Sequence, residues 1–468
     1  MFKIRKLYVV AFLLVLLFLL TRFYKIETSF NFFNDMGRDF LTLWQWKQDG
    51  KPPLLGPQTS ALPFNQSAIY FYLLYPFYLL SGQSFYATLI AYTTFYIAAF
   101  ILGLYLLRSH PRLEKSLLLV FLLISVHPQY IIQGRFVWNP SFVTPCVLTA
   151  FYSLMVYLEQ KKPQKLLLMI SAFSLALATG FSYSLVPTLI AFLVLILYRR
   201  RQIFLNYFFY VILSLLLVNL PTLVFELRHG FLLSKMMLFG DKLVQGDSSF
   251  LNRLLNLNKF SFATNWSWTM LYMILLAVFV YMSKLKEKNN FLGNSLLLFL
   301  FTLAITLLAP VPIHSHYVFG ILPLFFLTVS FLRPKFIFLS AVFFYIIFMK
   351  VALQFDYFAP IRNDLKTLTS CAENFCQTHN QALFVANQSK YHPYHNAMEW
   401  NYLLSNAGCK VKNINLENGS AAQMLVVLDD SSYSHGETSF YELTLFGKSQ
   451  EIEHLSCSDT LKMVLLQK

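Results

Sequence analysis

The chain has 468 residues, of which 57% are hydrophobic and only 13% are charged. An average soluble domain carries roughly 25% charged residues. The mean hydropathy of this chain is +0.54, so its composition excludes a disordered protein, a small disulfide scaffold and almost any single soluble domain. The formal net charge of +15 would suit nucleic-acid binding, but the basic residues form short clusters between long apolar runs. This placement follows the positive-inside rule and leaves no soluble basic face for a nucleic acid. The composition therefore predicts a polytopic α-helical membrane protein without a nucleic-acid partner.

The N-terminus combines a basic start with an apolar stretch over residues 7–20. A cleaved signal peptide has the same organisation, but here no small-residue cleavage site follows the apolar stretch. We therefore expect an uncleaved signal anchor whose N-terminus is cytoplasmic.

Apolar runs along the chain predict about eleven membrane spans. The expected spans are 6–24, 85–107, 117–134, 143–160, 166–181, 183–198, 204–222, 267–283, 290–309, 318–332 and 336–354. With these spans every basic cluster falls on the cytoplasmic side, which places the C-terminus outside a plasma (inner) membrane. The clusters are Lys3, Arg5 and Lys6; Arg108, Arg112 and Lys115; Lys161, Lys162 and Lys165; Arg199, Arg200 and Arg201; Lys284, Lys286 and Lys288; Arg333 and Lys335.

The outer segments are uneven in length. The first outer loop, 25–84, contains an aromatic run at 70–78 that is short and rich in tyrosine, so we expect an interfacial helix there. A true span at 70–78 is the alternative, and it would upset the alternation of the basic clusters. Residues 223–266 form a second long segment.

The C-terminal residues 355–468 are more polar than residues 1–354, and we expect them to form a soluble, extracytoplasmic α/β domain after the transmembrane domain. Strands are predicted at 383–386, 424–428 and 461–466, and a helix at 395–407 ends before Gly408. Six residues in or just before this helix are either acceptor contacts or ordinary surface and core of the domain: Tyr391, His392, Tyr394, His395, Glu399 and Trp400.

Four cysteines fall in this domain: Cys371, Cys376, Cys409 and Cys457. Four cysteines allow three pairings, of which Cys371–Cys376 with Cys409–Cys457 is the simplest, and free buried thiols are the alternative. Disulfides need an oxidising compartment, which agrees with an extracytoplasmic domain.

A charged motif opens the first outer loop, where Asp35, Arg38 and Asp39 stand within five residues. In a helix Asp35 and Asp39 lie one turn apart on one face. Asp35 would then act as a base while Arg38 binds a phosphate or orients a carboxylate. The alternative is a solvated helix start that carries acidic residues near its N-terminus.

Three further groups fall at the predicted outer face. The first holds Arg135, Trp138 and Asn139, and suits either a lipid phosphate or interfacial anchoring. The second holds Glu226, Arg228 and His229; the third holds His314, His316 and Tyr317. The two histidines are a weak metal pair and suit a phosphate or sugar contact better. The outer location of all these groups favours chemistry at the outer leaflet, and no glycine loop for a nucleotide phosphate is present.

These residues resemble the GT-C superfamily of membrane glycosyltransferases, especially bacterial enzymes of the protein O-mannosyltransferase and lipid A aminoarabinose transferase type. In that family an Asp-Glu-x-Arg motif opens the first outer loop. Asp35 and Arg38 match it, whereas Met36 replaces the glutamate and Asp39 offers a substitute. The sequence at 54–57 and the tyrosines at 70–77 also look like the family's Gly/Pro-rich stretch and the tyrosine run after it. The resemblance covers about 1–354, and an outer soluble tail fits it.

The resemblance implies an inverting transfer of a sugar from a polyprenyl-phosphate donor to an acceptor hydroxyl, with Asp35 as the base and Asp39 as the second carboxylate. Arg38, Arg135, Arg228 and His229 would bind the donor phosphate. Trp138, Asn139, Glu226, His314, His316 and Tyr317 are the further substrate contacts that we expect. The resemblance implies the bilayer, the lipid-linked donor and a glycan, lipid or protein acceptor as partners. It predicts no cofactor and leaves a divalent metal open.

Two other functions fit an outward-facing membrane protein of this kind. A flippase or transporter of a lipid-linked glycan would carry polar residues deep in its spans and repeated halves, which this sequence lacks. A glycan polymerase or ligase would use a diphosphate-linked donor instead.

Overall fold

The computed structural model describes residues 2–59, 65–239, 249–262, 291–309, 313–332, 358–389, 397–417, 419–429 and 441–468. The chain divides into two compact units, which we describe separately. The membrane unit comprises Met1–Tyr24 and Pro53–Tyr357, and the sheet unit comprises Lys25–Pro52 and Phe358–Lys468. Several predictions lie outside the described residues: the spans 267–283 and 336–354, the basic clusters at 284–288 and 333–335, and the acceptor-contact candidates Tyr391, His392, Tyr394 and His395.

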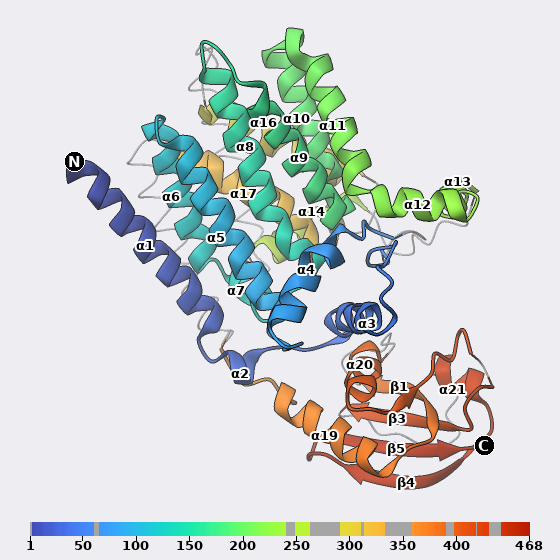
Figure 1. The fold of residues 1–468 in the computed structure, drawn as a ribbon. Helices are drawn as coiled ribbons and strands as arrows, with labels where there is room; N and C mark the ends of the chain where they lie inside the picture. The colour runs from blue at the N-terminus through green and yellow to red at the C-terminus, as the bar shows by residue number, and fades with distance from the viewer. Residues whose placement is uncertain are drawn as a thin grey trace. The chain divides into compact units, whose positions relative to one another are not determined.

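Long apolar helices build the membrane unit (Figure 1). They are α1 (Phe2–Phe23), α5 (Ala87–Leu107), α6 (Pro111–Val126), α8 (Val143–Glu159), α9 (Lys165–Phe181), α10 (Val186–Arg199), α11 (Phe204–Val218), α16 (Phe291–Leu308) and α17 (Val318–Ser330). Four segments of the described residues are long and apolar enough to cross a membrane: Ala87–Leu107, Asn139–Glu159, Arg201–Val218 and Phe291–Leu308. A helical membrane fold with a C-terminal sheet is therefore confirmed, whereas the count of eleven spans stays a prediction.

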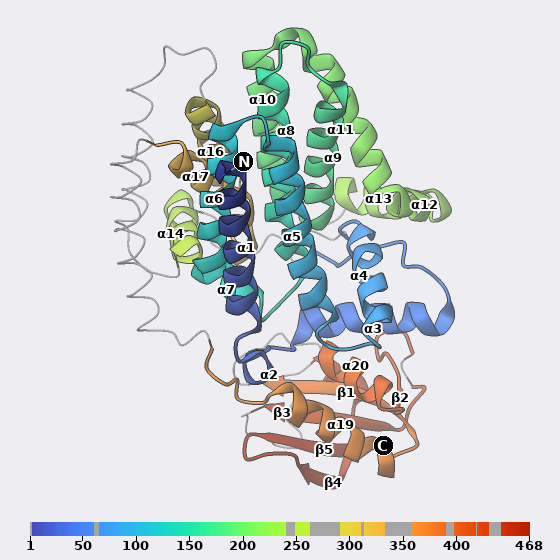
Figure 2. The same ribbon diagram turned by 60° about the vertical axis from the view of Figure 1, so that its left-hand side comes forward.

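Helix α8 is the centre of the membrane unit, since nearly all of its side chains are buried. It packs against α5, α9 and α17 (Figure 2). Helix α1 packs against α6, and α16 packs against α10 and α17.

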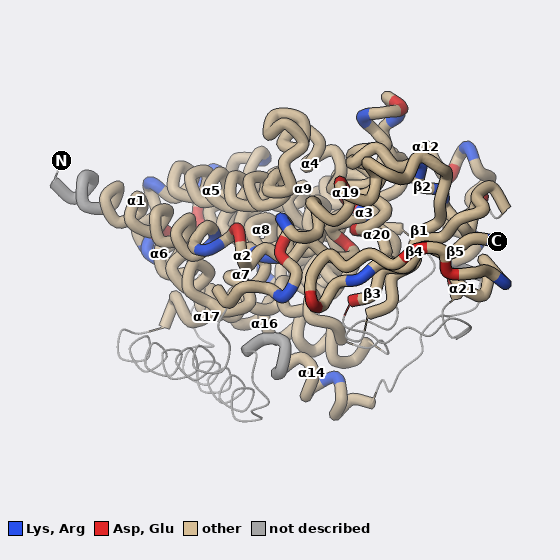
Figure 3. The backbone as a smooth tube through the Cα atoms, turned by 90° about the horizontal axis from the view of Figure 1, so that it is seen from below, with Lys and Arg blue, Asp and Glu red and all other residues tan. Residues whose placement is uncertain are grey.

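Helix α11 lies at the periphery and exposes large apolar side chains such as Leu205, Phe209 and Leu217. Helix α5 carries no charged residue along its length (Figure 3). A peripheral helix with an exposed apolar face is suited to contact with lipid.

The predicted span 117–134 is wrong as a single helix. Helix α6 ends at Val126, and a separate helix α7 spans Pro128–Gln133. His127, between the two helices, has an extended backbone conformation. Proline disfavours helical geometry in the residue before it and lacks the N–H that a continuing helix needs. Pro128 therefore divides the run, although the apolar pattern continues across it.

Short helices connect and flank the long ones. The aromatic run forms α4 (Ile69–Leu80), whose 12 residues are fewer than the ~20 that a span needs. The remaining short helices of the membrane unit are η1 (Asn139–Phe142), η2 (Tyr183–Leu185), η3 (Arg201–Ile203), α12 (Leu220–Arg228), α13 (Leu232–Phe239), α14 (Phe250–Phe262) and η4 (Ser315–Tyr317).

A five-stranded sheet forms the core of the sheet unit, with strand order β2-β1-β3-β5-β4. Strands β1 (Ala382–Ser389), β2 (Lys410–Val411) and β3 (Gln423–Asp429) are parallel, while β5 (Leu461–Gln467) runs antiparallel to β3 and to β4 (Gln450–Ser456). The helices are α2 (Ile26–Ser29), α3 (Asn34–Asp49), α19 (Leu365–Thr378), α20 (Met398–Asn406) and α21 (Tyr441–Phe446). The α/β class and all three predicted strands are confirmed.

Helices cover both faces of this sheet, because side chains of a strand alternate between its faces. Phe384, Met424, Val426 and Val464 share one apolar cluster with Phe446 of α21. Met463, the neighbour of Val464, instead contacts Cys371 of α19. Helix α20 packs against β1, α19 and α3. Trp400 is fully buried in this unit.

Helix α19 was not predicted from the sequence. It is amphipathic and buries Leu365, Leu368, Ala372 and Phe375 along one side. Asp364 caps its N-terminus, because its side chain accepts hydrogen bonds from the backbone N–H of Thr367 at 2.9 Å and from the Thr367 hydroxyl at 2.7 Å. These bonds lower the pKa of the Asp364 carboxyl below its ordinary value.

We expect Asp364→Ala to lower the free energy of unfolding of the sheet unit by about 1 kcal/mol, the usual contribution of an N-cap. The pKa of Asp364 is lower in the folded state than in the unfolded state. The stabilisation by its charge is therefore complete above the pKa of the unfolded state, about 3.9, and is lost as the pH falls through the pKa of the folded state. Thermal unfolding between pH 2 and pH 7 measures both effects. Asp364→Asn keeps a cap that does not titrate, so it is the matched control; the same acid-induced loss in this variant would contradict the assignment.

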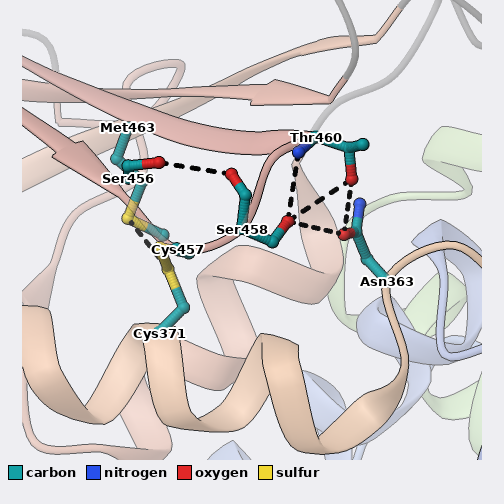
Figure 4. The surroundings of a disulfide bond; sticks show 7 residues. All are labelled: Asn363, Cys371, Ser456, Cys457, Ser458, Thr460 and Met463. Atoms are coloured by element: carbon teal, nitrogen blue, oxygen red, sulfur yellow. Dashed lines mark hydrogen bonds between the residues drawn. A yellow bond between two sulfur atoms is a disulfide. The ribbon is translucent and has the colours of Figure 1, made fainter.

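The predicted simplest disulfide pairing is wrong. The structure pairs Cys371 with Cys457 and Cys376 with Cys409, with Cα–Cα distances of 5.5 Å and 5.3 Å. Cys371 and Cys376 both lie on α19, five residues apart, so their side chains leave the helix in different directions and cannot meet. The first disulfide joins α19 to the turn between β4 and β5 (Figure 4). Asn363 ties down the same turn, since its Oδ1 accepts hydrogen bonds from Ser458 at 3.2 Å and Thr460 at 3.0 Å.

We expect the double variant Cys371→Ser, Cys457→Ser to lower the unfolding free energy of the sheet unit by about 2–5 kcal/mol, because a long closed loop is released in the unfolded chain. Limited proteolysis of the purified protein under oxidising conditions measures the loss. Strong reductant should abolish the difference between wild type and variant. Equal resistance to protease under oxidising conditions would show that this disulfide does not stabilise the unit.

Candidate functional site

The charged motif that was predicted to open the first outer loop forms the start of α3, in the sheet unit. Arg38 lies between two carboxylates: its Nη1 donates to Asp35 Oδ1 at 2.7 Å, and its Nε and Nη2 donate to Asp39 Oδ1 at 3.0 and 2.8 Å. The predicted one-turn spacing of Asp35 and Asp39 is therefore present. The side chain of Asp39 is completely buried, whereas that of Asp35 is 31% exposed. The two carboxylates thus have different environments.

One carboxylate oxygen of Asp35 is held in place, and the other is not. One of its oxygens is anchored by Arg38, while Oδ2 makes no hydrogen bond within the described part of the chain. Asp39 is buried behind the same arginine and keeps it oriented. A fixed, partly exposed carboxylate oxygen is able to accept a proton from a hydroxyl placed within hydrogen-bonding reach. Charged hydrogen bonds of this kind hold a side chain in place more firmly than neutral ones.

The buried face of α3 fixes this cluster against α20. Met36, Gly37, Phe40 and Leu43 recur at helical spacing and are buried. Gly37 stands between Asp35 and Arg38, and its Cα faces the backbone of Glu399 so closely that a Cβ there would overlap it. This glycine allows the two helix backbones to touch.

An aromatic cluster and a buried polar pair support the contact between α3 and α20. The rings of Phe32, Phe40 and Tyr402 lie with centroids 5.4–5.8 Å apart. Beneath the contact, Glu399 Oε1 accepts a hydrogen bond at 3.2 Å from the Asn387 amide of β1. The carboxyl of Glu399 is buried in the sheet unit. Asn387 was not singled out in the sequence, because a polar residue in an apolar strand gives no signal of its partner.

The other predicted residues lie in the membrane unit. Arg135 is buried and donates to the carbonyls of Thr21 at 2.6 Å and Tyr24 at 2.9 Å. It therefore satisfies carbonyls at the C-terminal end of α1, which have no partner within the helix. Asn139 is also buried and donates to the carbonyl of Phe181 at 2.6 Å.

The second group is arranged around α12. Glu226 is buried and accepts hydrogen bonds from the backbone N–H groups of Leu233 and Ser234, both at 2.9 Å, and from the Ser234 hydroxyl. Burial alone would raise its pKa, but these hydrogen bonds outweigh burial and lower it. Arg228 and His229 are exposed, and the His229 ring stacks on Phe225 at 4.0 Å. Glu226 therefore caps α13, while Arg228 and His229 stay accessible.

His316, of the third predicted group, contacts Trp138, of the first predicted group. The His316 ring contacts Trp138 edge to face at 5.4 Å and Tyr317 at 4.9 Å. His314 lies parallel to His316 with ring centroids 5.8 Å apart. The contact between Trp138 and His316 was not predicted, since the two residues are remote in the sequence. Within the described ranges no group of three or more His, Cys, Asp or Glu side chains is placed to hold a metal ion.

Arg22 is a buried residue that sequence reasoning missed. It donates to the carbonyls of Ser125 at 2.6 Å and Ile124 at 2.8 Å, and its guanidinium lies 4.2 Å from the Phe18 ring centroid. These carbonyls belong to the end of α6, where Pro128 interrupts the helix. Two features of the sequence hinted at this contact. One is an arginine at the end of an apolar run, and the other is a second apolar run that Pro128 interrupts.

Comparison with solved structures gives the fold a known counterpart. ArnT from Cupriavidus metallidurans, crystallised bound to undecaprenyl phosphate, superposes with a TM-score of 0.63 at 9% sequence identity, over 97% of each chain. Its apo form gives 0.62 at 10% identity, again over 97% of each chain. The predicted resemblance is therefore confirmed as a likeness of fold to ArnT, the lipid A aminoarabinose transferase. No family model and no curated protein sequence matches the chain.

Proposed function

We propose that this chain is a membrane glycosyltransferase that moves a sugar from a polyprenyl-phosphate donor to an acceptor hydroxyl at the outer face of the plasma membrane. The observation that carries the proposal is the Asp35–Arg38–Asp39 cluster at the start of the first outer loop of a chain with the ArnT fold. ArnT was crystallised with undecaprenyl phosphate, which supports a polyprenyl lipid as the partner. The orientation rests on the basic clusters and agrees with the two disulfides of the sheet unit.

The proposed step is a single displacement. The acceptor oxygen forms a bond to the anomeric carbon as the bond from that carbon to the phosphate oxygen breaks, and the polyprenyl phosphate leaves with the electron pair. The acceptor proton passes to Asp35. Attack from the face opposite the leaving group inverts the anomeric configuration. Such base assistance contributes about 10²–10⁴-fold to a rate.

Cationic side chains stabilise the charge that grows on the leaving phosphate. Arg38 has this role in the proposal, together with Arg228 and His229, whose exposed side chains are accessible to a lipid headgroup. Arg135 also belongs to the proposed donor-phosphate residues, although its Nη atoms are occupied by carbonyls of α1. Trp138, Asn139, Glu226, His314, His316 and Tyr317 remain proposed substrate contacts, and Asp39 the second carboxylate.

Donor-dependent release of polyprenyl phosphate tests the proposal. Purified full-length protein in liposomes is incubated with a panel of synthetic polyprenyl-phosphate sugars, and the lipid products are separated and quantified. Release from at least one monophosphate donor is expected. Activity only with diphosphate-linked donors would instead favour a polymerase or ligase. Movement of the lipid across the liposome without release would favour a flippase, and a folded protein inert in both assays would contradict the proposed enzyme.

A further inference from the structure

Helix α3 has a second, open face that lines a cleft within the sheet unit. Arg38, Leu41, Thr42 and Gln45 recur at helical spacing along this face, and Trp44 lies beside them. The opposite wall comes from α20 and from the segment that contains β2, including Asn401 and Lys410. The cleft encloses about 560 Å³, a volume typical of sites for small ligands.

The lining combines aromatic and amide groups. Trp44 is half-buried, and the side chains of Trp44, Gln45 and Asn401 make no hydrogen bond to other residues in the described part of the chain. Leu416 is 82% exposed at the cleft. A sugar ring offers an apolar C–H face for an aromatic side chain and hydroxyls for amides. The composition of the cleft therefore matches a carbohydrate better than a purely apolar chain.

The charges of the cleft are mostly already neutralised. Arg38 is held by two aspartates, and Lys412 is paired with Glu417 at 2.6 Å. Lys410 is exposed and Glu442 is half-buried, and neither has a charged partner among the described residues, so the cleft offers a ligand one cation and one carboxylate. One cation and one carboxylate beside several amides suit a glycan that carries few or no charged groups.

We propose that this cleft binds the acceptor of the transfer reaction and that the acceptor is a short stretch of glycan. The inference rests on the proposed function and specifies its substrate class. Arg38 lines the cleft and donates a hydrogen bond to Asp35. A glycan that packs on Trp44 and forms hydrogen bonds with Gln45 and Asn401 therefore shares the cleft with the arginine that anchors the base.

Cleft variants separate acceptor binding from chemistry. Trp44→Ala and Lys410→Gln are introduced into the full chain, and two rates are compared. The first is transfer of radioactive sugar from a synthetic polyprenyl-phosphate donor into the glycans of detergent-permeabilised cell envelopes. The second is hydrolysis of the same donor by the purified protein, where water replaces the acceptor. Lys47→Gln, an exposed lysine of α3 away from the cleft lining, is the matched control.

We expect transfer to fall about tenfold or more in the cleft variants, as for loss of a central contact, while hydrolysis stays within about twofold of wild type. Lys47→Gln should leave both rates unchanged. Unchanged transfer in both cleft variants, or an equal fall of transfer and hydrolysis, would overturn the acceptor cleft. Labelled product that protease destroys would overturn the glycan as its ligand. A wild-type protein that releases no polyprenyl phosphate contradicts the proposed function itself, and the cleft assignment then falls with it.

Discussion

Asp35→Asn is expected to reduce sugar transfer by about 10²–10⁴-fold, the usual contribution of a positioned base. The amide keeps the shape of the side chain and can still accept a hydrogen bond from Arg38 through its oxygen, but it cannot take the acceptor proton. The structure suits this variant because Asp35 is partly exposed and lies outside the packed face of α3. Initial rates of polyprenyl phosphate release measure the change. Binding of polyprenyl phosphate itself should persist, since the base acts in the transition state.

Asp49→Asn is the matched control for this substitution. Asp49 ends the same helix, is exposed, and lies roughly four turns from Asp35. It should retain the wild-type rate. If Asp35→Asn is as active as Asp49→Asn, Asp35 is not the base. If both polyprenyl phosphate binding and thermal stability collapse together with activity, its role is structural.

The sequence predicts best the elements whose signal lies within one segment. The length of the apolar runs predicted the membrane helices α5, α8 and α11. Short, buried apolar runs predicted the strands β1 and β3. The break between α6 and α7 was missed because the apolar run masked a local effect of Pro128. Helix α19 was missed because its apolar face is interleaved with polar residues over only a few turns.

Contacts between distant segments could not be predicted in the same way. The spacing of Asp35, Arg38 and Asp39 follows from helix geometry, so this part of the candidate site was accessible from the sequence. The contact of Trp138 with His316 and the pairing of Cys371 with Cys457 depend on how separate segments meet. Nor did the charges of Arg22 and Arg135 reveal that both would be used to satisfy carbonyls at helix ends.

The most informative of these distant contacts concerns the unit to which α3 belongs. Residues Lys25–Pro52 group with the C-terminal residues rather than with the spans that flank them in sequence. The position of the charged cluster thus depends on α20, which starts about 360 residues later along the chain. A change at the interface between α3 and α20 should therefore affect chemistry without touching a charged side chain.

Gly37→Ala is expected to lower transfer by about 10²-fold, because an active-site displacement of about 1 Å has an effect of this order. A Cβ at residue 37 would fall less than 3.0 Å from the backbone N and Cα of Glu399. Backbone atoms on both sides cannot rotate away as a side chain can, so α3 must shift and carry Asp35 and Arg38 with it. Overpacking of this kind also lowers the unfolding free energy by about 1–3 kcal/mol. Rates of polyprenyl phosphate release and hydrogen exchange of the α20 amides measure the two effects.

Gln48→Ala is the control for Gly37→Ala, since Gln48 is exposed on the same helix and the substitution removes side-chain atoms without adding any to the interface. It should leave the rate of transfer and the exchange of α20 unchanged. A normal rate in Gly37→Ala, with α20 protected as in wild type, would show that α3 does not rest on α20 at Gly37. A slower transfer together with faster exchange confined to α3 and α20 would instead show that this backbone contact between two distant segments holds the Asp35–Arg38–Asp39 cluster in place.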